Sequence, residues 1–218
     1  MEQNTWGMVL LPPGCKLVGS CWLFRMKTNG RYKARFVAQS FSQIPGVDSF
    51  APVARMSSVR LLLALAAEYN WDLVHLDVKT AFLQSELKEE ICVRQPRGFE
   101  NHSPSGAPYA CRLRRSLYGL CQSPASWFST IHQLLLDIEL KSCLADPCVY
   151  IKGSGTVILV LYVDDIIISG ASSDAINKVK EKLMTKFDMS YLGDVTTFLG
   201  MDIVRDRSTG VLLVRQCR

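Results

Sequence analysis

The alternation of apolar and polar positions predicts strands in three regions of the chain. Over residues 17–41, apolar side chains alternate with polar or basic ones on either side of Asn29-Gly30. This pattern predicts two strands joined by a hairpin, because Asn-Gly suits the tight turns that connect paired strands. Short apolar runs at residues 71–78 and 196–204 predict two further strands with buried side chains.

Helical periodicity begins at three serine positions. Ser57 precedes an apolar run and predicts an N-capped helix. Ser123 and Pro124 predict the N-cap and the first helical position of a second helix. Ser173 begins a third helix. The apolar face of the second helix consists of Trp127, Phe128, Ile131, Leu134, Leu135 and Ile138.

A hairpin with an unusual tip is predicted in the second half of the chain. Two β-branched runs, Val157–Val163 and Ile166–Ser169, are separated only by Asp164 and Asp165. From residue 71 onward, the predicted order is strand, excursion, helix, hairpin, helix, strand. This order is compatible with a split β-α-β sheet backed by two helices, which is an α+β fold.

Composition narrows the class of protein. The chain has 218 residues, of which 48% are hydrophobic and 21% are charged, so it can form one domain or two packed subdomains with a real core. Its longest apolar runs have seven residues, whereas a membrane-spanning helix needs about 18. The N-terminal residues lack the pattern of a secretory signal. We therefore expect no membrane association and an intracellular location. The net charge of +5 permits a polyanionic partner without requiring one.

The eight cysteines do not form a zinc motif. No two of them have the CxxC spacing, and the three histidines do not cluster with them. We expect reduced thiols that are mostly buried.

Three acidic residues indicate a site for divalent cations. Asp77 ends the predicted strand 71–78, and a split β-α-β sheet can place this strand beside the Asp164-Asp165 hairpin. Three carboxylates at one edge repel one another unless cations neutralise them, and Mg²⁺ prefers such oxygen ligands. Two Mg²⁺ ions about 4 Å apart would form a phosphoryl-transfer centre.

Simpler explanations of these acids stay open. Asp164 and Asp165 could lie in an exposed turn with solvated side chains, and Asp77 could merely end a strand. The chemistry by itself does not distinguish a polymerase from a nuclease or a cyclase.

Six ordered motifs resemble the reverse transcriptases of copia-type LTR retrotransposons. YVDD at 162–165 resembles their catalytic hairpin, and LDVKTAFLQSEL at 76–87 resembles their first catalytic motif. The other four are RYKARFVAQSFSQIPGVD (31–48), VRQPRGF (93–99), LYGLCQSPASW (117–127) and FDMSYLGDVTTFLGMDI (187–203). The resemblance covers nearly the whole chain.

This resemblance implies a right-hand polymerase core of fingers and palm, in which the palm is the split β-α-β sheet and the thumb is missing. The implied boundaries are fingers strands and a connecting helix at 1–70, the first catalytic palm strand at 71–83, a fingers insertion at 84–115, the palm with the YVDD hairpin at 116–204, and a truncated tail at 205–218.

The resemblance also implies catalytic roles. Asp77, Asp164 and Asp165 would hold two Mg²⁺ ions, for which Mn²⁺ is an alternative, and deoxynucleotides would be added to a primer 3′-OH on an RNA or DNA template. The implied nucleotide-binding residues are Lys33, Arg35, Phe82, Tyr118 and Gln122. The implied template and primer contacts are Gly119, Pro124, Tyr162, Leu192 and Gly193.

Each of these roles has a structural alternative. Lys33 and Arg35 lie at i and i+2, so both side chains share one face of a strand, but solvated charges on an edge strand have the same spacing. Phe82 would exclude a ribose 2′-OH by its bulk, or it could be an ordinary core residue. Gly119 could simply form a turn.

Departures from the family pattern leave an alternative function open; Cys121 favours it, and the presence of Asp77, Asp164 and Asp165 opposes it. Cys121 stands where the family usually has lysine, Ser190-Tyr191 replaces a charged pair, and Ser40 stands where glycine is common. The alternative is a catalytically inactive retroelement fragment or a domesticated nucleic-acid-binding module. Two other classes fit less well. An RNA-binding module would need exposed aromatic residues on its central strands, and a ribonuclease H-like nuclease would not pair its acids in a hairpin.

The natural context implied by the resemblance is a longer Pol polyprotein that also carries integrase and ribonuclease H. The expected location is the cytoplasm or a virus-like particle. The sequence indicates no oligomeric state.

Overall fold

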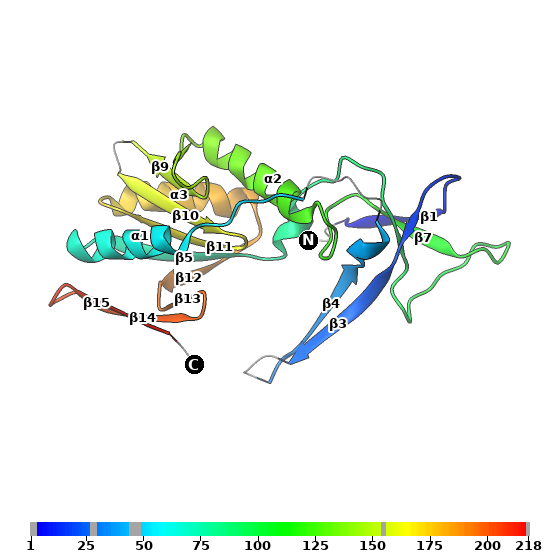
Figure 1. Ribbon diagram of the computed structural model, residues 1–218, viewed down its shortest axis with the longest axis horizontal. Coiled ribbons are helices and arrows are strands. Elements are labelled where there is room, and N and C mark those ends of the chain that lie inside the picture. Colours follow the sequence, from blue (N-terminus) through cyan, green and yellow to red (C-terminus); the bar gives the residue numbers. More distant parts are fainter. Residues whose placement is uncertain (1–3, 27–29, 44–48, 154–155, 217–218) are drawn as a thin grey trace. The chain divides into compact units, whose positions relative to one another are not determined.

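The chain forms a mixed α/β structure that divides into two compact units (Figure 1). The computed structural model describes residues 4–26, 30–43, 49–153 and 156–216. Unit 1 comprises Met1–Ala51 and Ala81–Thr130, and unit 2 comprises Pro52–Thr80 and Ile131–Arg218. No helix in these described ranges is long and apolar enough to cross a membrane.

Unit 1 contains a four-stranded sheet in the order β1-β7-β6-β2. Its strands are β1 (Trp6–Leu10), β2 (Leu17–Val18), β6 (Cys92–Arg94) and β7 (Tyr109–Leu113). β2 and β6 are parallel, and the other two pairs are antiparallel. Two short 3-10 helices, Ser40–Ser42 and Ala81–Gln84, belong to the same unit.

The predicted N-terminal hairpin is present but shorter than expected. β3 (Ser20–Met26) and β4 (Tyr32–Ala38) pair in antiparallel register, with Met26 opposite Tyr32. Residues 17–18 were predicted to extend the first strand, but they form β2 and pair with β6. Asn29 of the predicted turn lies outside the described residues.

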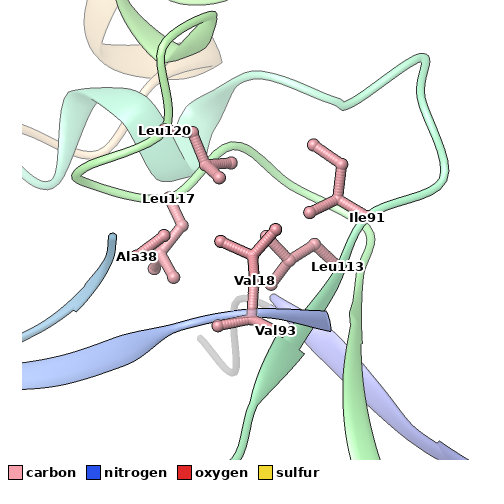
Figure 2. Packing of buried hydrophobic residues seen from close by; sticks show 7 residues of the cluster. All are labelled: Val18, Ala38, Ile91, Val93, Leu113, Leu117 and Leu120. Carbon is pink, nitrogen blue, oxygen red and sulfur yellow. The ribbon is translucent and has the colours of Figure 1, made fainter. Parts of the chain in front are cut away.

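A compact apolar cluster forms the core of unit 1 (Figure 2). It consists of Val18, Ala38, Ile91, Val93, Leu113, Leu117 and Leu120. These side chains come from β2, β4, β6, β7, the loop that follows β7, and Ile91, the residue before β6. Because fully burying one such aliphatic side chain contributes about 1.5–3 kcal/mol, the two leucines anchor the loop at residues 117–120 to the sheet.

Unit 2 is built on a six-stranded antiparallel sheet in the order β12-β5-β11-β10-β9-β8. The strands are β5 (Asp72–Val78), β8 (Lys141–Ser142), β9 (Val149–Lys152), β10 (Val157–Tyr162), β11 (Asp165–Gly170) and β12 (Met189–Asp194). β11 lies between β5 and β10, which are connected through the second helix. This is the arrangement of a split β-α-β unit.

Two helices pack on this sheet and a third joins the two units. α1 (Met56–Glu68) and α3 (Ser173–Lys186) both contact β11. They bury Val59, Leu62, Leu63 and Ala66 from α1, and Ile176, Val179 and Leu183 from α3. α2 (Ser123–Asp137) begins in unit 1 and ends in unit 2. Of its predicted apolar face, Trp127, Ile131, Leu135 and Ile138 are buried.

The helix starts differ from the predicted caps in two of three cases. α1 begins at Met56, so Ser57 is not its N-cap. α2 begins at Ser123, whose hydroxyl donates to the carbonyl of Leu117 (2.6 Å). α3 begins at Ser173 as predicted, and the Ser172 hydroxyl accepts from the Ala175 N–H.

The C-terminal strands correct three expectations. The predicted strand 196–204 is broken at Leu199-Gly200, which have φ angles of 50° and 77°. It forms β13 (Thr197–Phe198) and β14 (Met201–Asp206), and β14 pairs with β15 (Val211–Gln216) in the region expected to be a tail. β12, which was not predicted, pairs with β5 on the side opposite β11.

The two compact units do not coincide with the expected fingers and palm segments, whose boundaries stay a prediction. α1 was assigned to the fingers segment 1–70, but residues 52–80 belong to unit 2. Residues 116–130 were assigned to the palm segment, but they belong to unit 1. Because the contacts that define these units join segments far apart in sequence, contiguous boundaries could not describe them.

The cysteines in the described ranges, all but Cys217, are free thiols, as predicted, but the expectation that most are buried is wrong, because only Cys92, Cys111 and Cys148 are buried. Burial raises the pKa of Cys111 to about 11 and that of Cys148 to about 12. These two thiols therefore stay protonated at neutral pH and behave as small apolar side chains.

Candidate active site

The acidic hairpin tip is a strained two-residue turn. Tyr162 and Asp165 are the last paired residues of β10 and β11, so Val163 and Asp164 form the turn. Val163 has a φ of 57°, a left-handed conformation that is unfavourable for a β-branched residue. Such strain costs about 1–3 kcal/mol and persists only where the surrounding structure imposes it, often at functional sites.

Asp77 and Asp165 lie directly opposite each other on neighbouring strands. Tyr162, Asp165, Asp77 and Ser190 form one row across β10, β11, β5 and β12. Directly opposed residues of an antiparallel sheet project to the same face. The structure therefore brings these two carboxylates together, as the sequence predicted for the strand and the hairpin.

The backbone of Asp164 forms a hydrogen bond to β5 beside Asp77. Its carbonyl accepts a hydrogen bond from the N–H of Val78 (2.8 Å), the residue after Asp77. The side chains of Asp77, Asp164 and Asp165 are all half-buried. Like charges placed opposite each other on adjacent strands destabilise a sheet, so the arrangement favours a compensating cation.

A histidine that sequence reasoning missed contacts one of these acids. The Nε2 atom of His75 lies 2.9 Å from Oδ1 of Asp165. An ionised carboxylate only accepts hydrogen bonds, so Nε2 is the donor. His75 precedes Asp77 by two residues, and this spacing on a strand would have placed it on the same face as Asp77.

The three carboxylates are suitable ligands for Mg²⁺, but they do not by themselves form a closed metal site. Within the described ranges, no group of three or more His, Cys, Asp or Glu side chains is gathered closely enough to hold a metal ion. Mg²⁺ is usually held by one or two carboxylates together with substrate phosphates, and it rarely occupies an all-protein cage. The three half-buried carboxylates therefore fit Mg²⁺ as part of a site that substrate would complete.

Three of the predicted nucleotide-binding residues contact one another in unit 1. The rings of Phe82 and Tyr118 are tilted by 55°, with centroids 4.6 Å apart. The guanidinium of Arg35 lies over the Tyr118 ring, 5.7 Å from its centroid. Lys33 is two residues from Arg35 on β4, so both cations project from one face of the strand.

Gly119 is required by a close backbone approach. Its φ is 89°, and a Cβ atom at this position would lie 2.0 Å from the carbonyl oxygen of Ala38. The N–H of Ala38 donates to the carbonyl of Tyr118 (2.8 Å). The loop therefore packs directly on the end of β4. A template contact by Gly119 stays a prediction.

Gln122 has partners inside the protein. Its side chain is buried, and its Oε1 accepts from Nε2 of Gln43 (3.0 Å). Oε1 of Gln43 in turn accepts from the N–H of Cys121 (2.9 Å). These bonds give Gln122 a structural role in the loop, whereas its predicted nucleotide contact stays untested. Pro124, the second residue of α2, is half-buried.

The predicted primer contacts lie at a bulge in β12. Tyr191 pairs with Leu76 and Gly193 pairs with His75, so Leu192 is the extra residue. Leu192 is 52% exposed, and Gly193 has a φ of 82°. A bulge redirects side chains and is frequent beside active sites. Leu192 is therefore available to a ligand.

Comparisons with known proteins show the family to which the chain belongs. The family model described as reverse transcriptase (RNA-dependent DNA polymerase) matches residues 3–217. The chain is 40% identical over 227 residues to the "Retrovirus-related Pol polyprotein from transposon TNT 1-94" of Nicotiana tabacum, an alignment that covers 99% of this chain and 17% of that polyprotein.

More distant relatives share the same region. The Pol polyprotein from transposon RE2 of Arabidopsis thaliana is 34% identical over 93% of this chain and 15% of its own length. The Ty1-ER2 Gag-Pol polyprotein of Saccharomyces cerevisiae is 29% identical over 87% of this chain and 11% of its own length. The chain thus spans less than a fifth of these curated relatives, and it belongs to the reverse transcriptase (RNA-dependent DNA polymerase) family, in the form carried by copia-type retrotransposon Pol polyproteins.

Proposed function

We propose that this chain is the polymerase core of a reverse transcriptase that adds deoxynucleotides to a primer 3′-OH on an RNA or DNA template. The observation that carries the proposal is Asp77 opposite Asp165, with Asp164 in the adjoining turn. In this proposal, the six-stranded sheet of unit 2 is the palm, and unit 1 supplies the fingers.

Asp77 and Asp164 would hold two Mg²⁺ ions, with Asp165 assisting, and Mn²⁺ would serve as an alternative. When bound, such ions activate the attacking oxygen and stabilise the leaving one. The protein's own contribution is to keep three carboxylates half-buried at one sheet edge. In this position they are screened less by water than solvated acids are.

The cations and rings of unit 1 would bind the incoming nucleotide. Lys33 and Arg35 have the chemistry to pair with its phosphates, since charge-assisted hydrogen bonds to phosphate are strong. Phe82, in contact with Tyr118, would exclude a 2′-OH by its bulk. Gln122 would contribute to nucleotide binding by shaping the loop, to which it is bound through Gln43.

The template and primer would contact Gly119, Pro124, Tyr162, Leu192 and Gly193. The chain would act in a longer polyprotein with integrase and ribonuclease H, in the cytoplasm or in a virus-like particle. These assignments follow the family and its Pol polyprotein relatives.

Primer extension tests the proposal. Purified chain should extend a DNA primer on an RNA template with Mg²⁺ or Mn²⁺. Asp164→Asn should lower the rate by a factor on the order of 10³ or more, because it removes a charge that holds the cations. Asp174→Asn is the matched control: it makes the same change at an exposed position in the first turn of α3, and it should leave the rate unchanged.

The same experiment distinguishes the polymerase from the alternative, a nucleic-acid-binding module. Extension no faster than that of Asp164→Asn, from a folded chain that binds primer–template, would contradict the polymerase proposal. It would favour a nucleic-acid-binding module, for which Cys121 in place of the usual lysine is the supporting residue.

A further inference from the structure

We propose that His75 is a positioning residue that orients the Asp165 carboxylate at the candidate metal site. This inference rests on the proposed function, because it assigns His75 a part in preparing the same acids. His75 itself would contact neither substrate nor cation.

The strand register places His75 beside the acids. On β5, His75 is two residues before Asp77, so the two side chains share a face. On β11, Asp165 is opposite Asp77 and Ile167 is opposite His75. His75 is therefore the diagonal neighbour of Asp165, which is within the reach of an imidazole.

The hydrogen bond between them is largely shielded from water. Nε2 of His75 lies 2.9 Å from Oδ1 of Asp165, and the two side chains are 8% and 30% exposed. The bond engages one oxygen of the carboxylate and does not use Oδ2. Holding one oxygen restricts rotation of the carboxyl group, which fixes the direction in which the other oxygen points.

A buried ring keeps the imidazole in place. Phe198 of β13 meets the His75 ring edge-on, with centroids 5.6 Å apart and planes at 71°. The same Phe198 packs at 78° against Tyr162, which is opposite Asp165 on its other side. Phe198 is only 2% exposed. Phe198 therefore restricts movement of the imidazole on the side where the two rings meet.

Groups that orient a metal ligand contribute measurably although they never touch the metal. Replacing such a partner typically lowers metal affinity or activity about 10- to 100-fold. His75→Leu keeps a side chain of similar bulk but cannot donate a hydrogen bond, whereas His75→Gln keeps a donor.

The experiment measures two quantities on the full chain. Mn²⁺ affinity is determined by electron paramagnetic resonance without nucleic acid, and kcat and KM for deoxynucleotide are determined in primer extension. His132→Leu is the matched control, because His132 also hydrogen-bonds in unit 2, through its Nδ1 to the Tyr150 hydroxyl (2.7 Å). Thermal unfolding of every variant reports stability separately.

We expect His75→Leu to weaken Mn²⁺ binding about 10-fold or more and to lower kcat with little change in KM. His75→Gln should recover part of both losses. His132→Leu should lower the unfolding temperature only. Unchanged Mn²⁺ affinity in His75→Leu would overturn the proposal, and so would tighter binding, since His75 would then compete with the cation.

Three further cases are decisive. If His75→Leu does not fold, Phe198→Leu replaces it, because it keeps the imidazole but loosens its packing. Weaker Mn²⁺ binding then supports the proposal, and unchanged binding overturns it.

If the wild-type chain does not extend primers but Mn²⁺ binding still depends on His75, the polymerase proposal fails and the positioning role stands. If the chain extends primers and His75→Leu changes neither Mn²⁺ affinity nor kcat, the positioning role fails and the polymerase proposal stands.

Discussion

Single residues near the candidate site adopt conformations that their neighbours impose. Val163 holds a φ of 57° at the hairpin tip, and Gly119 holds a φ of 89° because its loop packs against Ala38. Phe82 is half-buried and contacts Tyr118 on one side. A partly exposed ring of this kind can present a rigid surface to a sugar, which a fully buried core residue cannot.

The selectivity of Phe82 is testable. Phe82→Ala should raise the ratio of ribonucleotide to deoxynucleotide incorporation about 10-fold or more, because the bulk that excludes a 2′-OH is removed. The ratio is obtained from kcat/KM for each nucleotide. Phe99→Ala, at a ring that is 68% exposed in unit 1, is the control and should not change the ratio. A Phe82→Ala ratio equal to that of wild type would remove Phe82 from the nucleotide site.

At the scale of elements, the start of α1 depends on a distant carboxylate. Oδ2 of Asp146 accepts from the N–H of Arg55 (2.8 Å) and the hydroxyl of Ser58 (2.6 Å), and Oδ1 accepts from the N–H of Cys148 (3.1 Å). Asp146 is buried. An acid at a helix N-terminus also interacts favourably with the helix dipole, so Asp146 replaces the cap expected from Ser57.

The pKa of Asp146 makes this contribution depend on pH. Burial raises the pKa, but the hydrogen bonds from Ser58, Arg55 and Cys148 outweigh it and leave the pKa below its ordinary value of 3.8. A carboxyl group whose pKa is lowered on folding stabilises the protein above its unfolded pKa, and this stabilisation is lost as the pH falls through the folded value.

Asp146→Ala should therefore lower the free energy of unfolding by about 2–4 kcal/mol at pH 7, since it leaves buried donors without an acceptor. The difference from wild type should shrink as the pH falls below the ordinary pKa of 3.8. Urea denaturation at pH 7 and pH 3 measures both effects. Asp137→Ala, at an exposed position in α2, should cost much less. An equal loss in both variants would contradict the capping role.

At the scale of the whole molecule, the residues proposed to hold the metal ions and those proposed to bind the nucleotide belong to different units. Asp77, Asp164 and Asp165 belong to unit 2, whereas Lys33, Arg35, Phe82 and Tyr118 belong to unit 1. The net charge of the chain is only +5. Binding to primer–template would therefore depend on where the cations lie rather than on their sum.

Cation removal should separate binding from chemistry. In EDTA, primer extension should stop while primer–template binding persists, and added Mg²⁺ or Mn²⁺ should restore extension, because the cations serve the reaction. Binding should weaken steadily with added salt, as expected for contacts to phosphate. Fluorescence anisotropy and primer extension on the same samples measure both. Extension that continues in EDTA would exclude a metal-dependent mechanism.

Local patterns predicted some elements well and others poorly. The β10–β11 hairpin, β5 and α3 are close to their predicted positions because each follows one periodicity and has a clear boundary. β12 and the break at Leu199-Gly200 were missed. β12 alternates weakly and contains a bulge, and the break depends on two left-handed residues, of which one is a leucine.

By itself, the sequence determined the family, the acidic hairpin and the strand that ends near Asp77, because the hairpin, the strand and each family motif consist of consecutive residues. Only the tertiary structure decided which residues meet across long separations. His75 and Asp165 are 90 residues apart, and Asp146 is 88 residues from Ser58. Such contacts depend on strand register and on the packing of distant elements. Hydrophobic periodicity indicates which face of a strand is buried, but not which strand becomes its neighbour.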